Sequence, residues 1–110
     1  MLTLLALLAD SRNSLPSGSV VSNICREVVQ ADAVLSREAL SQLLTIPERD
    51  RKEAVRLVIR EPYCRLPSVE VRQGVMAERE AYPLAFDPQT WFVVLYEGDE
   101  YAGYSFVFQH

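Results

Sequence analysis

The C-terminal stretch over residues 91–108 constrains this sequence more than any other feature, because it predicts a β-hairpin. Two runs of aromatic and β-branched residues flank a segment typical of a hairpin turn, Glu97-Gly98-Asp99-Glu100. A two-residue and a four-residue turn share one centre here, so both predict the same register. That register pairs Tyr96 with Tyr101, Val94 with Gly103 and Phe92 with Ser105.

Both faces of the predicted hairpin are largely apolar. One face holds Trp91, Val93, Leu95, Ala102, Tyr104, Phe106 and Phe108, and the other holds Phe92, Val94, Tyr96, Tyr101, Gly103, Ser105 and Val107. A hairpin with one wet face alternates apolar and polar residues, and a large exposed apolar patch is rare on a monomer. We therefore expect the helices to cover the Trp91–Leu95–Phe106 face and something else to cover the second face.

Apolar residues at helical spacing predict two or three short helices before this hairpin. Val20, Val21, Ile24 and Val28 form one stripe and predict a helix of about three turns. Ser36 is the expected N-cap of a second helix, with Leu35 and Leu40 in the hydrophobic-staple positions. A third helix is expected from about Pro47 to Arg60, because Thr45 and Glu48 match the capping-box spacing and Pro62 stops it. Its expected buried side is Ala54, Val55, Val58 and Ile59.

Beyond Pro67 the apolar period changes from 3.6 to 2, which predicts a strand over about 68–81, although 76–81 also fits a helix. The 110 residues suit one domain, with a helical part at 1–66 and a sheet part at 67–110. We predict an α+β fold with two to three short N-terminal helices on a three-stranded antiparallel sheet that ends in the C-terminal hairpin.

The two cysteines, Cys25 and Cys64, do not form the dense framework of a small secreted domain. We interpret both as reduced thiols and predict a cytoplasmic location. The run Met1–Ala9 lacks the basic start of a signal peptide and is too short to cross a bilayer, so it predicts a short buried helix. Tyr63 and Arg65 flank Cys64, which makes it the best candidate for a reactive thiol, although an unreactive thiol is the default.

No residue pattern predicts catalysis or ligand binding. The single histidine is His110, so neither a nucleophile–histidine pair nor a zinc set is expected, and no glycine-rich phosphate loop is present. Carboxylates gather at Glu78 and Glu80 and in the hairpin turn, and we interpret them as solvated groups. We therefore predict a protein that is not an enzyme and has no catalytic residues, cofactor, metal or small-molecule substrate.

The leading functional hypothesis is a protein–protein interaction or assembly module that buries the second hairpin face against a second copy or another protein. Its expected contact residues are Phe92, Val94, Tyr96 and Tyr101. Whether Met1–Ala9 covers this face within one chain or across a homodimer stays open.

A winged-helix DNA-binding regulator is the alternative hypothesis. Its recognition helix would carry Arg49, Arg51, Lys52 and Arg56. Nucleic-acid binding is nevertheless unlikely, because residues 67–110 hold two basic residues against seven acidic ones and the wing tip would be acidic.

Overall fold

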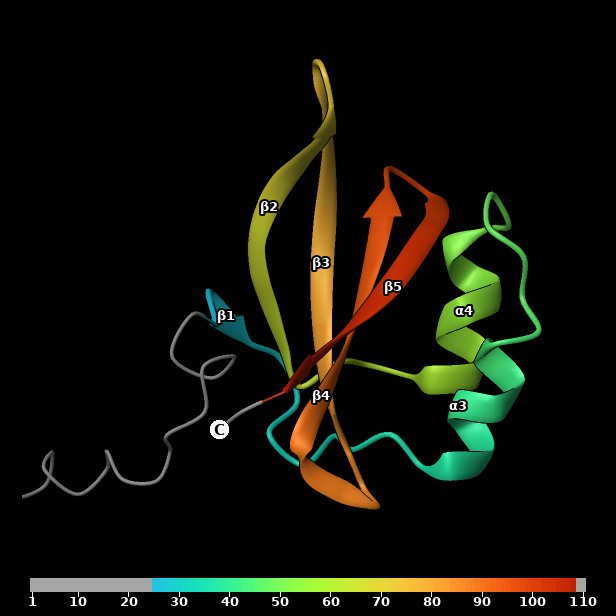
Figure 1. Cartoon of the computed structure of the whole chain (residues 1–110), viewed down its shortest axis with the longest axis vertical. Helices are drawn as coiled ribbons and strands as arrows, with labels where there is room; N and C mark the ends of the chain where they lie inside the picture. The colour runs from blue at the N-terminus through green and yellow to red at the C-terminus, as the bar shows by residue number, and fades with distance from the viewer. Residues whose placement is uncertain (1–24, 109–110) are drawn as a thin grey trace, which may run out of the picture.

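An antiparallel sheet, with strands that follow one another along the chain, dominates the structure, which is a computed structural model describing residues 25–108 (Figure 1). The elements are β1 (Glu27–Val28), α3 (Arg37–Leu43), α4 (Lys52–Ile59), β2 (Cys64–Arg72), β3 (Val75–Leu84), β4 (Asp87–Glu97) and β5 (Glu100–Phe108). The strand order is β1-β2-β3-β4-β5, so β5 forms one edge. The predicted helix at Met1–Ala9 and the start of the predicted helix near Val20 lie outside the described residues.

The predicted fold class is wrong, because the sheet has five strands rather than three and the described helices number two. The region predicted as one strand is a hairpin of β2 and β3, which turns at Gln73-Gly74 with a φ of 77° at Gly74. Another turn, at Ala85-Phe86, joins β3 to β4. The predicted helix around Val28 is also wrong over its described part, because Val28 belongs to β1 and pairs with Cys64.

The sequence correctly predicted the N-cap of the first described helix, which depends on residues close together in the chain. Ser36 caps α3 as predicted, and its hydroxyl accepts a hydrogen bond from the amide of Ala39 at 3.1 Å. The predicted start of α4 is wrong by five residues, because Arg49 has a φ of 81° and the hydroxyl of Thr45 donates to the carbonyl of Gln42 instead of capping. The helix ends as expected beside Arg60, and Val55 and Ile59 are buried.

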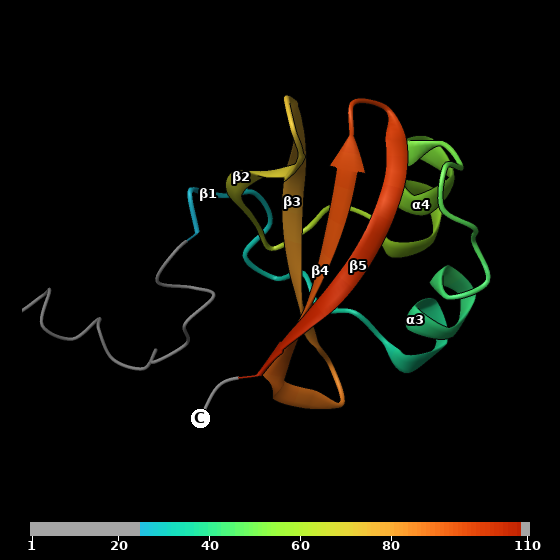
Figure 2. The ribbon, with the colours of Figure 1, turned by 45° about the horizontal axis from the view of Figure 1, so that its top comes forward.

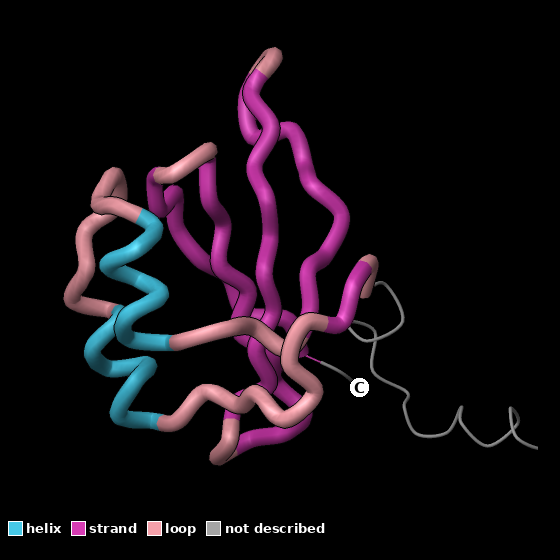
Figure 3. Tube along the Cα trace, turned by 180° about the vertical axis from the view of Figure 1, so that it is seen from behind, coloured by secondary structure: helices cyan, strands magenta, loops and turns pink. Residues whose placement is uncertain are grey.

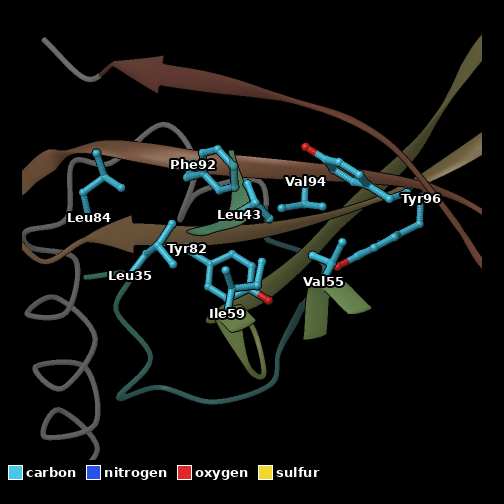
Figure 4. Packing of buried hydrophobic residues seen from close by; sticks show 10 residues of the cluster. Leu35, Leu43, Val55, Ile59, Tyr82, Leu84, Phe92, Val94 and Tyr96 are labelled. Carbon is cyan, nitrogen blue, oxygen red and sulfur yellow. The ribbon is translucent and has the colours of Figure 1, made fainter. Parts of the chain in front are cut away.

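Both helices pack on the Phe92–Val94–Tyr96 face of the sheet, which is the face that we predicted to need a different cover. In the close-up, Val55 and Ile59 of α4 and Leu43 of α3 lie among Tyr82, Phe92, Val94 and Tyr96 (Figure 4). Seen from behind, the helices lie at the β4–β5 side of the molecule, and the β1–β2 side extends away from them (Figure 3). The prediction that helices cover the Trp91–Leu95–Phe106 face is therefore wrong.

A β-bulge in β5 explains why Phe106 does not share a face with Trp91 and Leu95. Tyr96 pairs with Tyr101 as predicted, but the register then shifts by one residue, so Val94 pairs with Tyr104 and Phe92 with Phe106. A shift of one residue turns every later side chain to the opposite face. The extra residue is Ala102, and the next residue, Gly103, has a φ of 127°. An added Cβ at Gly103 would lie 3.3 Å from a carboxylate oxygen of Glu48. Tyr104, Phe106 and Phe108 consequently lie on the same face as Phe92.

The other face of the sheet carries a second, smaller core of Cys64, Leu66, Ala81, Trp91 and Val93. Tyr63 packs edge-on against Trp91 at 5.1 Å between ring centroids. Cys25 forms a disulfide with Cys64, with 5.8 Å between their Cα atoms, so the prediction of two reduced thiols is wrong. Disulfides persist in oxidising compartments, and the cysteines therefore no longer support a cytoplasmic location. Over residues 25–108, no helix is long and apolar enough to cross a membrane.

Candidate interaction surface

The four predicted contact residues lie in the interior of the chain. Phe92, Val94 and Tyr96 are fully buried and Tyr101 is 2% exposed, all in the cluster beneath α3 and α4. Burial raises the pKa of the Tyr96 hydroxyl well above its ordinary value, as expected for a phenol removed from water. These side chains already pack against the helices of their own chain, so they do not form an exposed contact surface.

Three aromatic side chains of β5 are exposed instead, and we call Tyr104, Phe106 and Phe108 the aromatic strip. Their exposed fractions are 45%, 37% and 60%. Tyr104 stacks on Phe92 and Phe106 meets it edge-on, each at 5.3 Å between ring centroids. The buried ring of Phe92 thus holds two members of the strip in place. The sequence predicts that these residues share a face with Trp91 and Leu95 and are covered by the helices, whereas in the structure they share a face with Phe92 and are exposed.

Among the residues that the structure describes, the outer edge of β5 is covered only at its beginning. Residues 49–52, which we call the cover loop, run beside this part of the strand. The amide of Arg49 donates to the carbonyl of Tyr101, and the amide of Tyr101 donates to the carbonyl of Asp50, both at 2.8 Å. The amide of Lys52 donates to the carbonyl of Asp99 at 2.7 Å. Within residues 25–108 no strand pairs with the outer edge beyond this point.

An ion-pair network fastens the cover loop to the acidic hairpin turn. Arg49 contacts a carboxylate oxygen of Glu97 at 3.2 Å and one of Glu100 at 2.9 Å, and Arg72 of β2 forms two hydrogen bonds to Glu97. Hydrogen bonds from Arg72 and Arg49 lower the pKa of Glu97 below its ordinary value. The predicted solvated turn is therefore partly paired, and the loop has a defined position against β5.

The second half of β5 runs away from both helices toward the C-terminal end of the described chain (Figures 1 and 2). The stretch from Tyr104 to Phe108 has no charged residue and no proline. Natural edge strands are usually interrupted by charges, proline or bulges that prevent pairing with another chain. The bare half of β5 has none of these beyond the bulge at Gly103, so it combines unpaired backbone groups with exposed aromatic rings.

The second predicted carboxylate cluster is an internal ion pair. Glu80 is 1% exposed and accepts two hydrogen bonds from Arg56 of α4, at 2.6 Å and 3.2 Å. Burial alone would lower the pKa of Arg56, but its bonds to Glu80 outweigh this and raise the pKa. Glu78 lies 3.6 Å from Lys52. In the part of the chain that the structure describes, no three potential metal ligands are grouped together.

The cations expected on a recognition helix are also paired. Arg49 and Arg51 precede α4, and Arg51 contacts Glu53 at 3.3 Å. Lys52 and Arg56 face Glu78 and Glu80, as described above. A sheet of five strands also differs from the single hairpin of a winged helix. No observation favours DNA binding, and we do not carry that alternative further.

Two surface hollows lie away from the aromatic strip. One, of about 400 Å³, lies beside β1 and β2 and includes Arg65 and Glu27, which pair at 3.5 Å. The other, of about 530 Å³, includes Arg56 and Glu61, which pair at 3.4 Å. Each hollow is lined by both acidic and basic residues, so neither selects a ligand of one charge. Cys64, the best candidate for a reactive thiol in the sequence, is unavailable as a nucleophile because it is bonded to Cys25.

Comparisons with protein-family models, curated proteins and solved structures find no match to this chain. The fold and the surface define its class by themselves: a mostly sheet protein whose described part has a five-stranded antiparallel sheet, two short helices on one face, and one sheet edge that is half covered and half bare and aromatic.

Proposed function

We propose that this protein is a non-catalytic protein–protein interaction module and that its contact surface is the bare half of β5. The observation that carries the proposal is the aromatic strip on an edge strand that no described strand pairs beyond Tyr101. An extended segment of another chain can add to such an edge through backbone hydrogen bonds, while side-chain contacts on alternate residues supply specificity. Aromatic rings are the side chains most enriched in the centres of protein interfaces.

Site-specific photo-crosslinking tests this proposal. A benzophenone amino acid replaces Phe106 in the full-length protein, which is irradiated in the cells that produce it. We expect covalent adducts of discrete, higher mass, because the partner lies directly against this side chain. The matched control places the same amino acid at Met76, which is 55% exposed near the start of the central strand β3, away from the outer edge of β5.

The outcomes separate clearly. Adducts at position 106 that are absent at position 76 support the proposal. Equal labelling at both positions, or none at either, overturns it. A crosslink from position 106 to the chain's own Met1–Ala9 run, without a gain in mass, also overturns it, because the strip would then be an internal surface.

The cellular compartment of the protein is tested in the same cells. The sequence predicts the cytoplasm, whereas the Cys25–Cys64 disulfide favours an oxidising compartment. Rapid alkylation of thiols in intact cells, followed by mass spectrometry, reads the state of both cysteines. Two alkylated cysteines support the cytoplasmic prediction, and an unmodified disulfide contradicts it.

A further inference from the structure

We infer that the bare half of β5 binds the bare half of β5 of a second copy, antiparallel across a two-fold axis at Phe106, which joins the two sheets into one. This inference rests on the proposed function and names its partner. Most soluble homo-oligomers are two-fold dimers, whose interface must be complementary to itself. The segment from Tyr104 to Phe108 meets this condition, because it has no charge and carries an aromatic residue at both ends and in the middle.

The cover loop determines how much of β5 a second copy can reach. Hydrogen bonds from the loop occupy the outer edge at Asp99 and Tyr101, and a carboxylate oxygen of Glu48 lies 3.3 Å from where a Cβ of Gly103 would be. A partner strand is therefore excluded until Tyr104. The strand β5 runs to Phe108, so the part of it that a second copy can reach is centred on Phe106.

Symmetry about Phe106 fixes every cross-strand pair. Phe106 lies opposite Phe106 of the second copy, and Tyr104 lies opposite Phe108 in both directions. Directly opposite residues of antiparallel strands lie on the same face of the sheet. All exposed rings of the aromatic strip would thus be covered by rings of the other copy, which accounts for their exposure in one chain.

Charge favours the antiparallel direction over the parallel one. Glu97, Asp99 and Glu100 surround the hairpin turn at the start of β5. Parallel pairing would place the two acidic turns about 5 Å apart, at the spacing of neighbouring strands. Antiparallel pairing about Phe106 separates the two Asp99 residues by roughly 45 Å. Salt at ordinary ionic strength screens the repulsion between charges that lie more than about 8–10 Å apart. Electrostatic repulsion therefore excludes only the parallel arrangement.

The test is a charge-swap series measured by sedimentation of the full-length protein. We expect the native chain to dimerise with rising concentration. The double variant Tyr104→Lys/Phe108→Lys should weaken dimerisation at least about tenfold, because each lysine meets a lysine of the other copy in a partly desolvated strand pair. The double variant Tyr104→Glu/Phe108→Lys should recover most of the loss, because each carboxylate then faces a lysine across the interface. Positions 104 and 108 are about 13 Å apart within one strand, so they do not pair in the monomer.

A cysteine at the proposed axis provides a second measurement that depends less on folding of the double variants. Antiparallel neighbours have Cα atoms about 4.5–5.5 Å apart, within disulfide range. Phe106→Cys should form a disulfide-linked dimer under mild oxidation, whereas Val71→Cys on β2 should not.

Each contrary result has a defined meaning. A native chain that stays monomeric at all concentrations overturns the inference, while adducts to another protein in the photo-crosslinking experiment would still support the proposed function. Dimerisation that is unchanged in the variant Tyr104→Lys/Phe108→Lys also overturns the inference. Weakening without recovery by Tyr104→Glu/Phe108→Lys overturns the register about Phe106 and leaves the proposed function standing.

Discussion

At one edge of the sheet, the two-residue strand β1 covers the start of β2, and the Cys25–Cys64 disulfide fastens it there. The rest of β2 contains Pro67, two register irregularities and several charged residues. At the other edge, β5 is covered over its first residues by the cover loop and then continues as an uncharged, aromatic strand.

The contrast shows that this chain has the usual means of preventing edge-to-edge pairing along β2 and at the start of β5, but not along the second half of β5. Proline, bulges and charges keep an edge from pairing with another chain. Their presence on β2 and absence from the second half of β5 argue that the bare aromatic edge is not a general property of a small sheet. This difference between the two edges supports contact through β5.

The largest expected effect is at the closed edge. Cys25→Ser should lower the free energy of unfolding by about 2–4 kcal/mol, because the disulfide closes a loop between residues 39 positions apart. Urea denaturation of the variant and the native protein measures the loss. The native protein treated with a reductant should have the same urea midpoint as the variant. A midpoint that is unchanged in both would show that the disulfide does not stabilise the fold.

The next effect is at the junction between the covered and bare halves of β5. Gly103→Ala should cost about 1–3 kcal/mol, because its φ of 127° disfavours a side chain and the new Cβ would press on Glu48. Gly74→Ala is the matched control, with a φ of 77° and open space around it, and should cost about 1 kcal/mol. Thermal unfolding compares the two, and equal losses would contradict a role for the Glu48 contact.

A smaller effect is expected at Glu97, which links Arg72 of β2 with Arg49 of the cover loop. Its lowered pKa means that its contribution to stability is present above the ordinary carboxyl pKa of 4.5 and is lost as pH falls through the folded-state value. Glu97→Gln should therefore be less stable than the native protein at neutral pH, and the gap should close in acid. Denaturation at several pH values measures the gap, and a gap that does not change with pH would contradict the ion-pair account.

The smallest effect on stability is expected from a charge placed on the bare edge. Phe108→Lys should change the free energy of unfolding of the dilute protein by no more than about 0.5 kcal/mol, because the side chain is 60% exposed. It should nevertheless slow aggregation during refolding, since lysine discourages edge pairing. Val71→Lys on β2 should leave aggregation unchanged, and equal slowing by both variants would remove the distinction between the edges.

Local signals predicted the parts of this fold that depend on neighbours in sequence. The cap at Ser36, the end of α4 beside Arg60 and the pairing of Tyr96 with Tyr101 each follow from residues within a few positions of one another. The start of β2 escaped prediction because Pro67 is typical of a loop, and the rest of β2 was predicted as strand but was joined to β3 across the turn at Gly74. The same proline suits a strand at a protected edge.

The candidate surface could be predicted only in part, because its position depends on long-range contacts. The exposed and buried faces of β5 are exchanged by one bulge, which involves Glu48 more than fifty residues before Gly103. The disulfide likewise joins distant positions, and nothing in the spacing of Cys25 and Cys64 distinguishes it from two separate thiols. The sequence did identify the aromatic hairpin as an element with more apolar surface than its own helices could cover.

The cover loop has a geometric consequence for any β5 dimer. Because the loop ends the accessible edge at one side, its length sets the position of the symmetry axis along the strand. Exposing one more residue of β5 would move that axis by half a residue, from a side chain to a peptide bond, and would change which rings meet. The length of the loop between α3 and α4 would then determine which residues of two β5 strands lie opposite each other. Two chains that differ by a single insertion or deletion in this loop would no longer have matching interfaces and would each pair with their own kind.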